Sequence, residues 1–254
     1  MSTERLYLER VAGNPAMLGC ARLGALAALY ANVFAGDPWN EYTACSVDNT
    51  FFGRTTQPGD SCPQPDCNGI LALAYPQEKT ADYIAAELTR PDAALWLLRD
   101  AEKDGKEVGF SWGFSYANPE DFAQDKYKTP AMQASVRELL RRLNLGAGGL
   151  WYLSESGIED SPNYRGQGLS KLFHERRLEV ARSLGLDAIQ RTNSAGNMYR
   201  TSRRTMTQIM GPAMEADGAS RRLVTTGEIV NGVADTEMPS RVLFARRSET
   251  NPTT

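Results

Sequence analysis

The 254-residue chain is 41% hydrophobic and 23% charged, the balance of an ordinary soluble globular protein. Its formal net charge of -3 offers no general attraction to nucleic acid or to an anionic membrane, so neither is expected as a partner. The longest apolar stretch, Leu23 to Phe34, is shorter than the roughly 20 residues that span a bilayer, and the charged N-terminal residues are unlike a signal peptide. We therefore expect a cytoplasmic protein, whose four cysteines are thiols or metal ligands rather than disulfides.

The sequence of the N-terminal half predicts a strand at 6–11, a helix at 16–35, a turn-rich insertion at 40–70, a helix at 78–88 and two strands at 93–100 and 107–116. Leu6 and Leu8 alternate as in a strand, and apolar residues then recur at helical spacing as far as Gly36. The insertion is rich in turn-forming residues and holds three of the four cysteines. Asp104 and Gly105 favour a hairpin between the last two strands.

The sequence of the C-terminal half predicts helices at 130–145, 168–186 and 197–209. It predicts strands at 149–158, 187–192, 222–226 and 241–246. This order of elements implies an α/β (α+β) fold, in which a mixed central sheet carries helices on its faces. No internal repeat divides the chain, so we expect a single domain over residues 1–254 with the cysteine-bearing insertion at about 40–70.

A glycine-rich turn precedes the helix at 168–186. It reads Arg165-Gly166-Gln167-Gly168 and leads directly into Leu169 and Ser170. Glycines allow a ligand to approach the backbone closely, and the first amides of a helix have no partner within the helix. Together with the positive end of the helix dipole, these amides favour a phosphate or pyrophosphate. The alternative is a tight turn without a ligand; the stretch has neither the lysine of a Walker loop nor the third glycine of the dinucleotide fingerprint.

The helix after this turn is predicted to dock on the sheet. Its expected buried face consists of Leu169, Leu172, Phe173, Val180 and Leu184. His174, the only histidine, stands among charged residues and is expected to be solvated.

The turn resembles the acetyl-CoA pyrophosphate loop of the GNAT N-acetyltransferase superfamily, whose motif is [RQ]-x-x-G-x-[GA]. Arg165, Gly168 and Leu169 fit this motif, whereas Ser170 stands where Gly or Ala is usual. The stretches "WYLSESGI" and "IQRTNSAGNMY" resemble the family's fourth strand and the strand and helix start that follow. "FAGDPWNE" and "VGFSWGF" are similar to the end of the first helix and to the third strand in some members.

This resemblance implies a largely antiparallel sheet and transfer of the acetyl group of acetyl-CoA to a primary amine. It implies that the cofactor contacts are Ile158, Arg165, Gly166, Gln167, Gly168, Leu169, Ser170, Asn193 and Asn197. Of these, Ile158 would present a backbone N–H to the oxyanion, and the asparagines have helix capping as the alternative role. Tyr199 would protonate the departing CoA thiolate, or else serve as an aromatic core residue. The acceptor would be a small-molecule or protein amine, and the resemblance leaves a homodimer open. The alternative function is a non-catalytic acyl-CoA-binding or interaction module on the same fold.

Glu155 is the candidate general base. It is expected on the strand before the loop, on the face shared with Trp151 and Leu153. Apolar neighbours raise the pKa of a carboxylate toward the range in which it accepts a proton from an amine. The alternative is a solvated or ion-paired carboxylate without a chemical role.

A serine hydrolase is a distant alternative. The stretch Gly109 to Gly113 matches the G-x-S-x-G nucleophile elbow, and Ser111, Asp160 and His174 follow in the chain order of a triad. The elbow requires a strand, a sharp turn and a helix, whereas Ser111 is expected inside a strand.

Three cysteines and an aspartate in the insertion could hold a structural zinc ion. Cys45, Asp48, Cys62 and Cys67 offer the four ligands that zinc prefers, with Asp48 at the position where a C-x-x-C pair would have its second cysteine. The alternative is a set of free thiols, which is what we expect of Cys20 in the first helix.

Overall fold

The computed structural model describes residues 5–12, 18–37, 39–142, 144–164, 166–193, 224–225 and 241–246. The chain forms two compact units. The first comprises Met1–Ser111 and Glu155–Gly168, and the second comprises Trp112–Ser154 and Leu169–Thr254. The single-domain organisation stays a prediction.

The sheet of the first unit consists of β1 (Leu6–Ala12), β5 (Ala94–Asp100), the first half of β6 (Lys106–Tyr116) and β8 (Ser156–Ile158). Strand β1 pairs antiparallel with β5, and β8 pairs antiparallel with β6. Because β5 reads as an almost unbroken apolar run, its residues are buried on both faces. A short 3-10 turn (η2, Ala101–Lys103) and two left-handed residues, Asp104 and Gly105, then reverse the chain as predicted.

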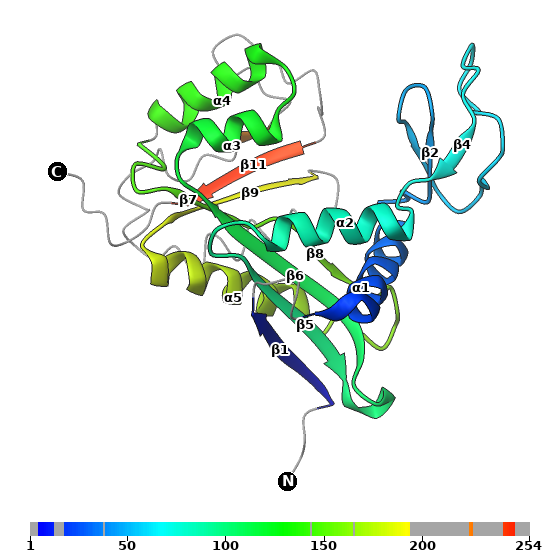
Figure 1. Cartoon of the computed structure of the whole chain (residues 1–254), viewed down its shortest axis with the longest axis horizontal. Helices are drawn as coiled ribbons and strands as arrows, with labels where there is room; N and C mark the ends of the chain where they lie inside the picture. Colours follow the sequence, from blue (N-terminus) through cyan, green and yellow to red (C-terminus); the bar gives the residue numbers. More distant parts are fainter. Residues whose placement is uncertain are drawn as a thin grey trace. The chain divides into compact units, whose positions relative to one another are not determined.

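Two helices of the first unit, α1 (Gly19–Phe34) and α2 (Gln77–Leu88), lie side by side (Figure 1). Helix α1 contacts β8, and this contact depends on Gly157. A Cβ added there would lie 2.6 Å from Cγ1 of Val33 and 2.7 Å from Cζ of Phe110. Glycine is therefore the residue that allows the helix and the strand to approach this closely.

The cysteine-bearing insertion contains a small sheet that the sequence analysis did not predict. Its strands are β2 (Thr43–Cys45), β3 (Phe51–Phe52) and β4 (Leu71–Leu73), in the order β3-β2-β4 with antiparallel pairing. Each strand has only two or three residues, too few to show a period of two in the sequence. Figure 1 shows this sheet as an extension beyond α1 and α2.

The sheet of the second unit consists of the second half of β6, β7 (Leu150–Tyr152), β9 (Asp187–Asn193), β11 (Arg241–Arg246) and β10 (Val224–Thr225), in that order. Only the β7–β9 pair among these is parallel. Its helices are α3 (Pro119–Lys126), α4 (Pro130–Arg142) and α5 (Leu169–Leu184). The expected fold class, a mixed and largely antiparallel sheet flanked by helices, is confirmed. The expected helix at 197–209 lies outside the described residues.

Helix α3 was missed. Asn118 caps it by accepting a hydrogen bond from the backbone N–H of Asp121, and Pro119 occupies its first turn. The sequence analysis placed no element between the strand at 107–116 and the helix at 130–145. Within the described part of the chain, no helix is long and apolar enough to cross a membrane.

The buried face of α5 differs from the predicted one, and the prediction for His174 is wrong. The buried residues are Phe173, His174, Arg177, Leu178 and Ala181, whereas Leu184 is 41% exposed. His174 is fully buried, and burial followed by the charge of Arg177 lowers its pKa well below the ordinary value. The imidazole is therefore neutral at pH 7. A hydrophobic pattern counts a histidine and an arginine as surface residues, which is why it assigned the helix face incorrectly.

Candidate active site and cysteine cluster

The strand expected over residues 149–158 is interrupted at Leu153–Glu155, between β7 and β8. Phe114 pairs with Tyr152, and Ser111 pairs with Ser156. Between these two pairs, β6 advances by three residues (111 to 114) and the segment from β7 to β8 advances by four (152 to 156). The one extra residue forms a bulge. Bulges redirect a strand and are frequent beside active sites.

The bulge is followed by a strand that pairs on one side only among the described strands. In the described part of the chain β8 pairs with β6 alone, and the backbone N–H of Glu159 donates to the carbonyl of Val108 at 2.8 Å. Hydrogen-bonded and non-hydrogen-bonded pairs alternate in an antiparallel ladder. The neighbouring pair of Ile158 with Gly109 is therefore non-hydrogen-bonded, and the N–H of Ile158 points away from β6. This orientation is the one that an oxyanion donor at Ile158 requires.

Glu155 lies in the interruption rather than on a strand face shared with Trp151 and Leu153, so that part of the expectation is wrong. Its side chain is half-buried, and the hydroxyl of Tyr83 on α2 donates to its Oε1 at 3.3 Å. Burial, followed by the charge of Glu155, raises the pKa of the buried Tyr30 well above its ordinary value. The Glu155 carboxylate thus interacts with aromatic side chains on both α1 and α2.

Tyr30 and Tyr83 form an aromatic cluster with Tyr75, which precedes α2, and with a second carboxylate. Tyr30 packs edge-on against Tyr75 and Tyr83, with ring centroids 5.1 and 6.2 Å away. The hydroxyl of Tyr75 donates to the carboxylate of Glu41, and the ring of Tyr75 stacks with that of Phe51 in the insertion. Aromatic faces and carboxylates are the groups that attract an ammonium ion.

The glycine turn before α5 adopts the backbone conformation that glycine favours. Gly166 and Gly168 have φ values of 77° and 73°, and a Cβ added at either would meet nothing within 4 Å. Gln167 is exposed, and its amide donates to the carbonyl of Asn163 at 2.5 Å. Helix α5 then begins at Leu169, with Ser170 as its second residue. The turn therefore leaves open space beside both glycines at a helix N-terminus.

The segment before this turn is held in place by Tyr164, which the sequence analysis missed. Tyr164 is buried; its hydroxyl donates to Oδ2 of Asp100 at 2.9 Å and accepts from Lys103 at 2.8 Å. Arg5 donates to the same buried carboxylate at 3.0 Å. The hydrogen bond from Arg5, which is the largest cause, and the one from Tyr164 lower the pKa of Asp100 to about 2. No local pattern marks Tyr164, because its partner lies 64 residues earlier.

Three predicted site residues, Arg165, Asn197 and Tyr199, lie outside the described residues. The backbone of Asn193 is described at the end of β9, where it pairs with Arg241.

The serine hydrolase alternative is not supported. Strand β6 runs without interruption from Lys106 to Tyr116, so the G-x-S-x-G stretch forms no elbow. Ser111 is fully buried in mid-strand, and its hydroxyl has no hydrogen-bond partner among the described residues.

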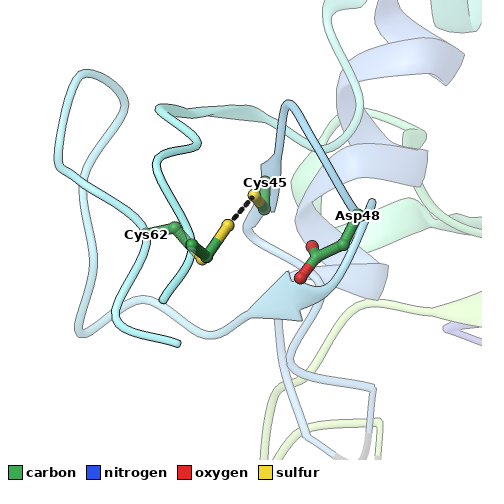
Figure 2. Close-up of side chains that lie close together, drawn as sticks. Cys45, Asp48 and Cys62 are labelled. Atoms are coloured by element: carbon green, nitrogen blue, oxygen red, sulfur yellow. Dashed lines mark hydrogen bonds between the residues drawn. The ribbon is translucent and has the colours of Figure 1, made fainter. Parts of the chain in front are cut away.

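The four predicted metal ligands lie together in the insertion. One ligand atom from each of Cys45, Asp48, Cys62 and Cys67 lies within 4.8 Å of all the others. Figure 2 shows Cys45, Asp48 and Cys62 converging from β2, from the turn after it and from the facing loop. The backbone N–H of Asp48, followed by that of Val47, lowers the pKa of the Cys45 thiol. Cys20 is exposed on α1, apart from this set.

No protein-family model and no curated protein matches the chain. Many of the solved structures to which it is similar are GNAT-family N-acetyltransferases. Polyamine N-acetyltransferase of Drosophila melanogaster has 12% identity and a TM-score of 0.46, over 95% of this chain and 99% of that chain. A GNAT-family acetyltransferase from Streptococcus pneumoniae has 13% identity and a TM-score of 0.41, over 95% and 98%. An aminoglycoside N-acetyltransferase in complex with CoA has 9% identity and a TM-score of 0.40, over 80% and 86%.

Proposed function

We propose that the protein is a GNAT-type N-acetyltransferase that transfers the acetyl group of acetyl-CoA to a primary amine. The observation that carries this proposal is the turn at Gly166–Gly168, which has the family's motif, left-handed glycines and open space at the start of α5. The first amides of a helix have no partner within the helix and suit the pyrophosphate of CoA. Arg165, Gln167, Leu169 and Ser170 complete the proposed loop, and Asn193 and Asn197 are the further cofactor contacts.

The chemistry assigns one role to each of three residues. Glu155 takes a proton from the acceptor ammonium, and the neutral amine then attacks the thioester carbonyl carbon. The carbonyl oxygen becomes negatively charged, and the N–H of Ile158 points away from β6 to donate to it. When the C–S bond breaks, Tyr199 protonates the CoA thiolate, and the acylated nitrogen returns its excess proton to the tyrosinate, leaving a neutral amide and free CoA.

The acceptor is proposed to be an amine that is cationic in solution. Glu155 and Glu41 each accept a hydrogen bond from a tyrosine of the aromatic cluster. Carboxylates beside aromatic rings favour a cation over a neutral or anionic group. Trp112 and Tyr116 are buried in β6 and are not part of this proposal.

The test measures the rate at which the CoA thiol is released from acetyl-CoA in the presence of each of a panel of amines, with a thiol-reactive dye as the detector. We expect Glu155→Gln to lower kcat by about 100-fold or more, the scale of losing a general base, with acetyl-CoA affinity unchanged. The matched control is Glu159→Gln, which removes a carboxylate four residues along the chain that pairs with Lys106. Binding of acetyl-CoA without thiol release in the presence of any amine would favour the non-catalytic CoA-binding or interaction module.

A further inference from the structure

We propose that Cys45, Asp48, Cys62 and Cys67 bind one zinc ion, which holds the insertion in its folded form. The site would be structural, since transfer of an acetyl group to an amine requires no metal. It is independent of the proposed function.

The separations of the ligand atoms suit tetrahedral coordination. Zn–S bonds of about 2.3 Å place two sulfurs of a tetrahedron about 3.8 Å apart. The sulfurs of Cys45 and Cys67 are 3.5 Å apart, and all four ligand atoms lie within 4.8 Å of one another. A disulfide has sulfurs about 2 Å apart, and all three of these cysteines are free thiols. Three soft thiolates with one carboxylate oxygen select zinc over calcium or magnesium.

The backbone is shaped around the sulfurs. The N–H of Val47 donates to the sulfur of Cys45 at 3.4 Å, an interaction that favours a thiolate ligand. A Cβ added at Gly69 would lie 2.3 Å from the sulfur of Cys45 and 3.3 Å from that of Cys67. Gly69 therefore leaves room for the sulfurs, whereas any larger residue would displace them.

The insertion has little apolar core with which to fold. Its buried cluster consists of Cys45, Cys62 and Leu71, with Phe52 and Cys67 packed against it. Strands of two or three residues with so small a core are marginal without a disulfide or a metal. A zinc ion would join the turn after β2 to the loop that leads into β4, and so close the small sheet.

The experiment is zinc analysis by plasma mass spectrometry on protein purified without chelator. We expect about one zinc per chain, its loss in Cys67→Ser, and its retention in Cys20→Ser, which removes a distant exposed thiol. Asp48→Asn should retain zinc but release it faster to a chromogenic chelator, because only the exposed ligand is weakened. The proposal is overturned if the wild type holds no zinc, or if Cys67→Ser and Cys20→Ser hold equal amounts.

Two further readouts do not depend on how well a variant folds. Wild-type protein in which cobalt replaces zinc should show the intense visible absorption bands of a tetrahedral thiolate site. The weak spectrum of octahedral cobalt would contradict the proposed coordination. Chelation of the wild type should open residues 46–70 to limited proteolysis while the remainder of the chain stays intact. An unchanged cleavage pattern after the zinc is removed would refute the structural role.

Discussion

Asp100 shows how a single residue couples distant segments of the first unit. Its carboxylate is fully buried and accepts hydrogen bonds from Arg5, Tyr164 and the backbone N–H of Glu102. A buried carboxylate is tolerated because these donors replace water. The consequence for the proposed site is indirect: Asp100 anchors Tyr164, and Tyr164 immediately precedes the proposed pyrophosphate loop.

We expect Asp100 to make stability depend on acid pH. Its pKa is about 2 in the folded chain and near 4 in an unfolded one, so the unfolded state binds the proton first as the pH falls. The stabilisation is fully present above about pH 4 and is lost between about pH 4 and pH 2. Urea unfolding at a series of pH values should show a steeper loss for the wild type than for Asp100→Asn. Parallel curves for the two proteins would contradict the assignment.

At the scale of elements, long runs were predictable and short or redirected ones were not. Strand β5 was found because it is an almost unbroken apolar run within seven residues, and helix α2 because helical spacing extends over most of its twelve residues. The bulge at Leu153–Glu155 was missed, since one extra residue leaves no trace in a hydrophobic pattern. The cysteine cluster was predicted because cysteines are few and their spacing is informative, whereas Tyr83 and Tyr164 depend on partners 72 and 64 residues away.

The contact of α1 with β8 gives an element-scale prediction. Gly157→Ala should lower the free energy of unfolding by about 1–3 kcal/mol, because the added Cβ overlaps Val33 and Phe110. The control is Gly24→Ala within α1, where a Cβ would lie 3.3 Å from the flexible amide end of Gln77. That change should be neutral or stabilising by up to about 1 kcal/mol, since alanine is the better helix former. Equal urea midpoints for both variants would show that the close approach at Gly157 has no energetic consequence.

At the scale of the whole molecule, the first unit carries most of the proposed machinery. It contains Glu155, Ile158, the glycine turn and the cysteine cluster. The second segment of the second unit starts at Leu169, with helix α5. The proposed activity therefore depends on whether the turn at the start of α5 binds the pyrophosphate of CoA. Transfer of the acetyl group presupposes that binding.

The most direct measurement is calorimetric titration of acetyl-CoA into the wild type and into Gly168→Asn and Gly168→Asp. Asparagine and aspartate are nearly equal in size and both tolerate the left-handed backbone at this position, so the pair differs chiefly by one negative charge. A charge placed about 4 Å from a pyrophosphate costs on the order of 1–4 kcal/mol. We predict that the wild type binds acetyl-CoA and that Gly168→Asp binds it at least tenfold more weakly than Gly168→Asn. Absence of binding by the wild type, or equal affinities of the two variants, would contradict this prediction.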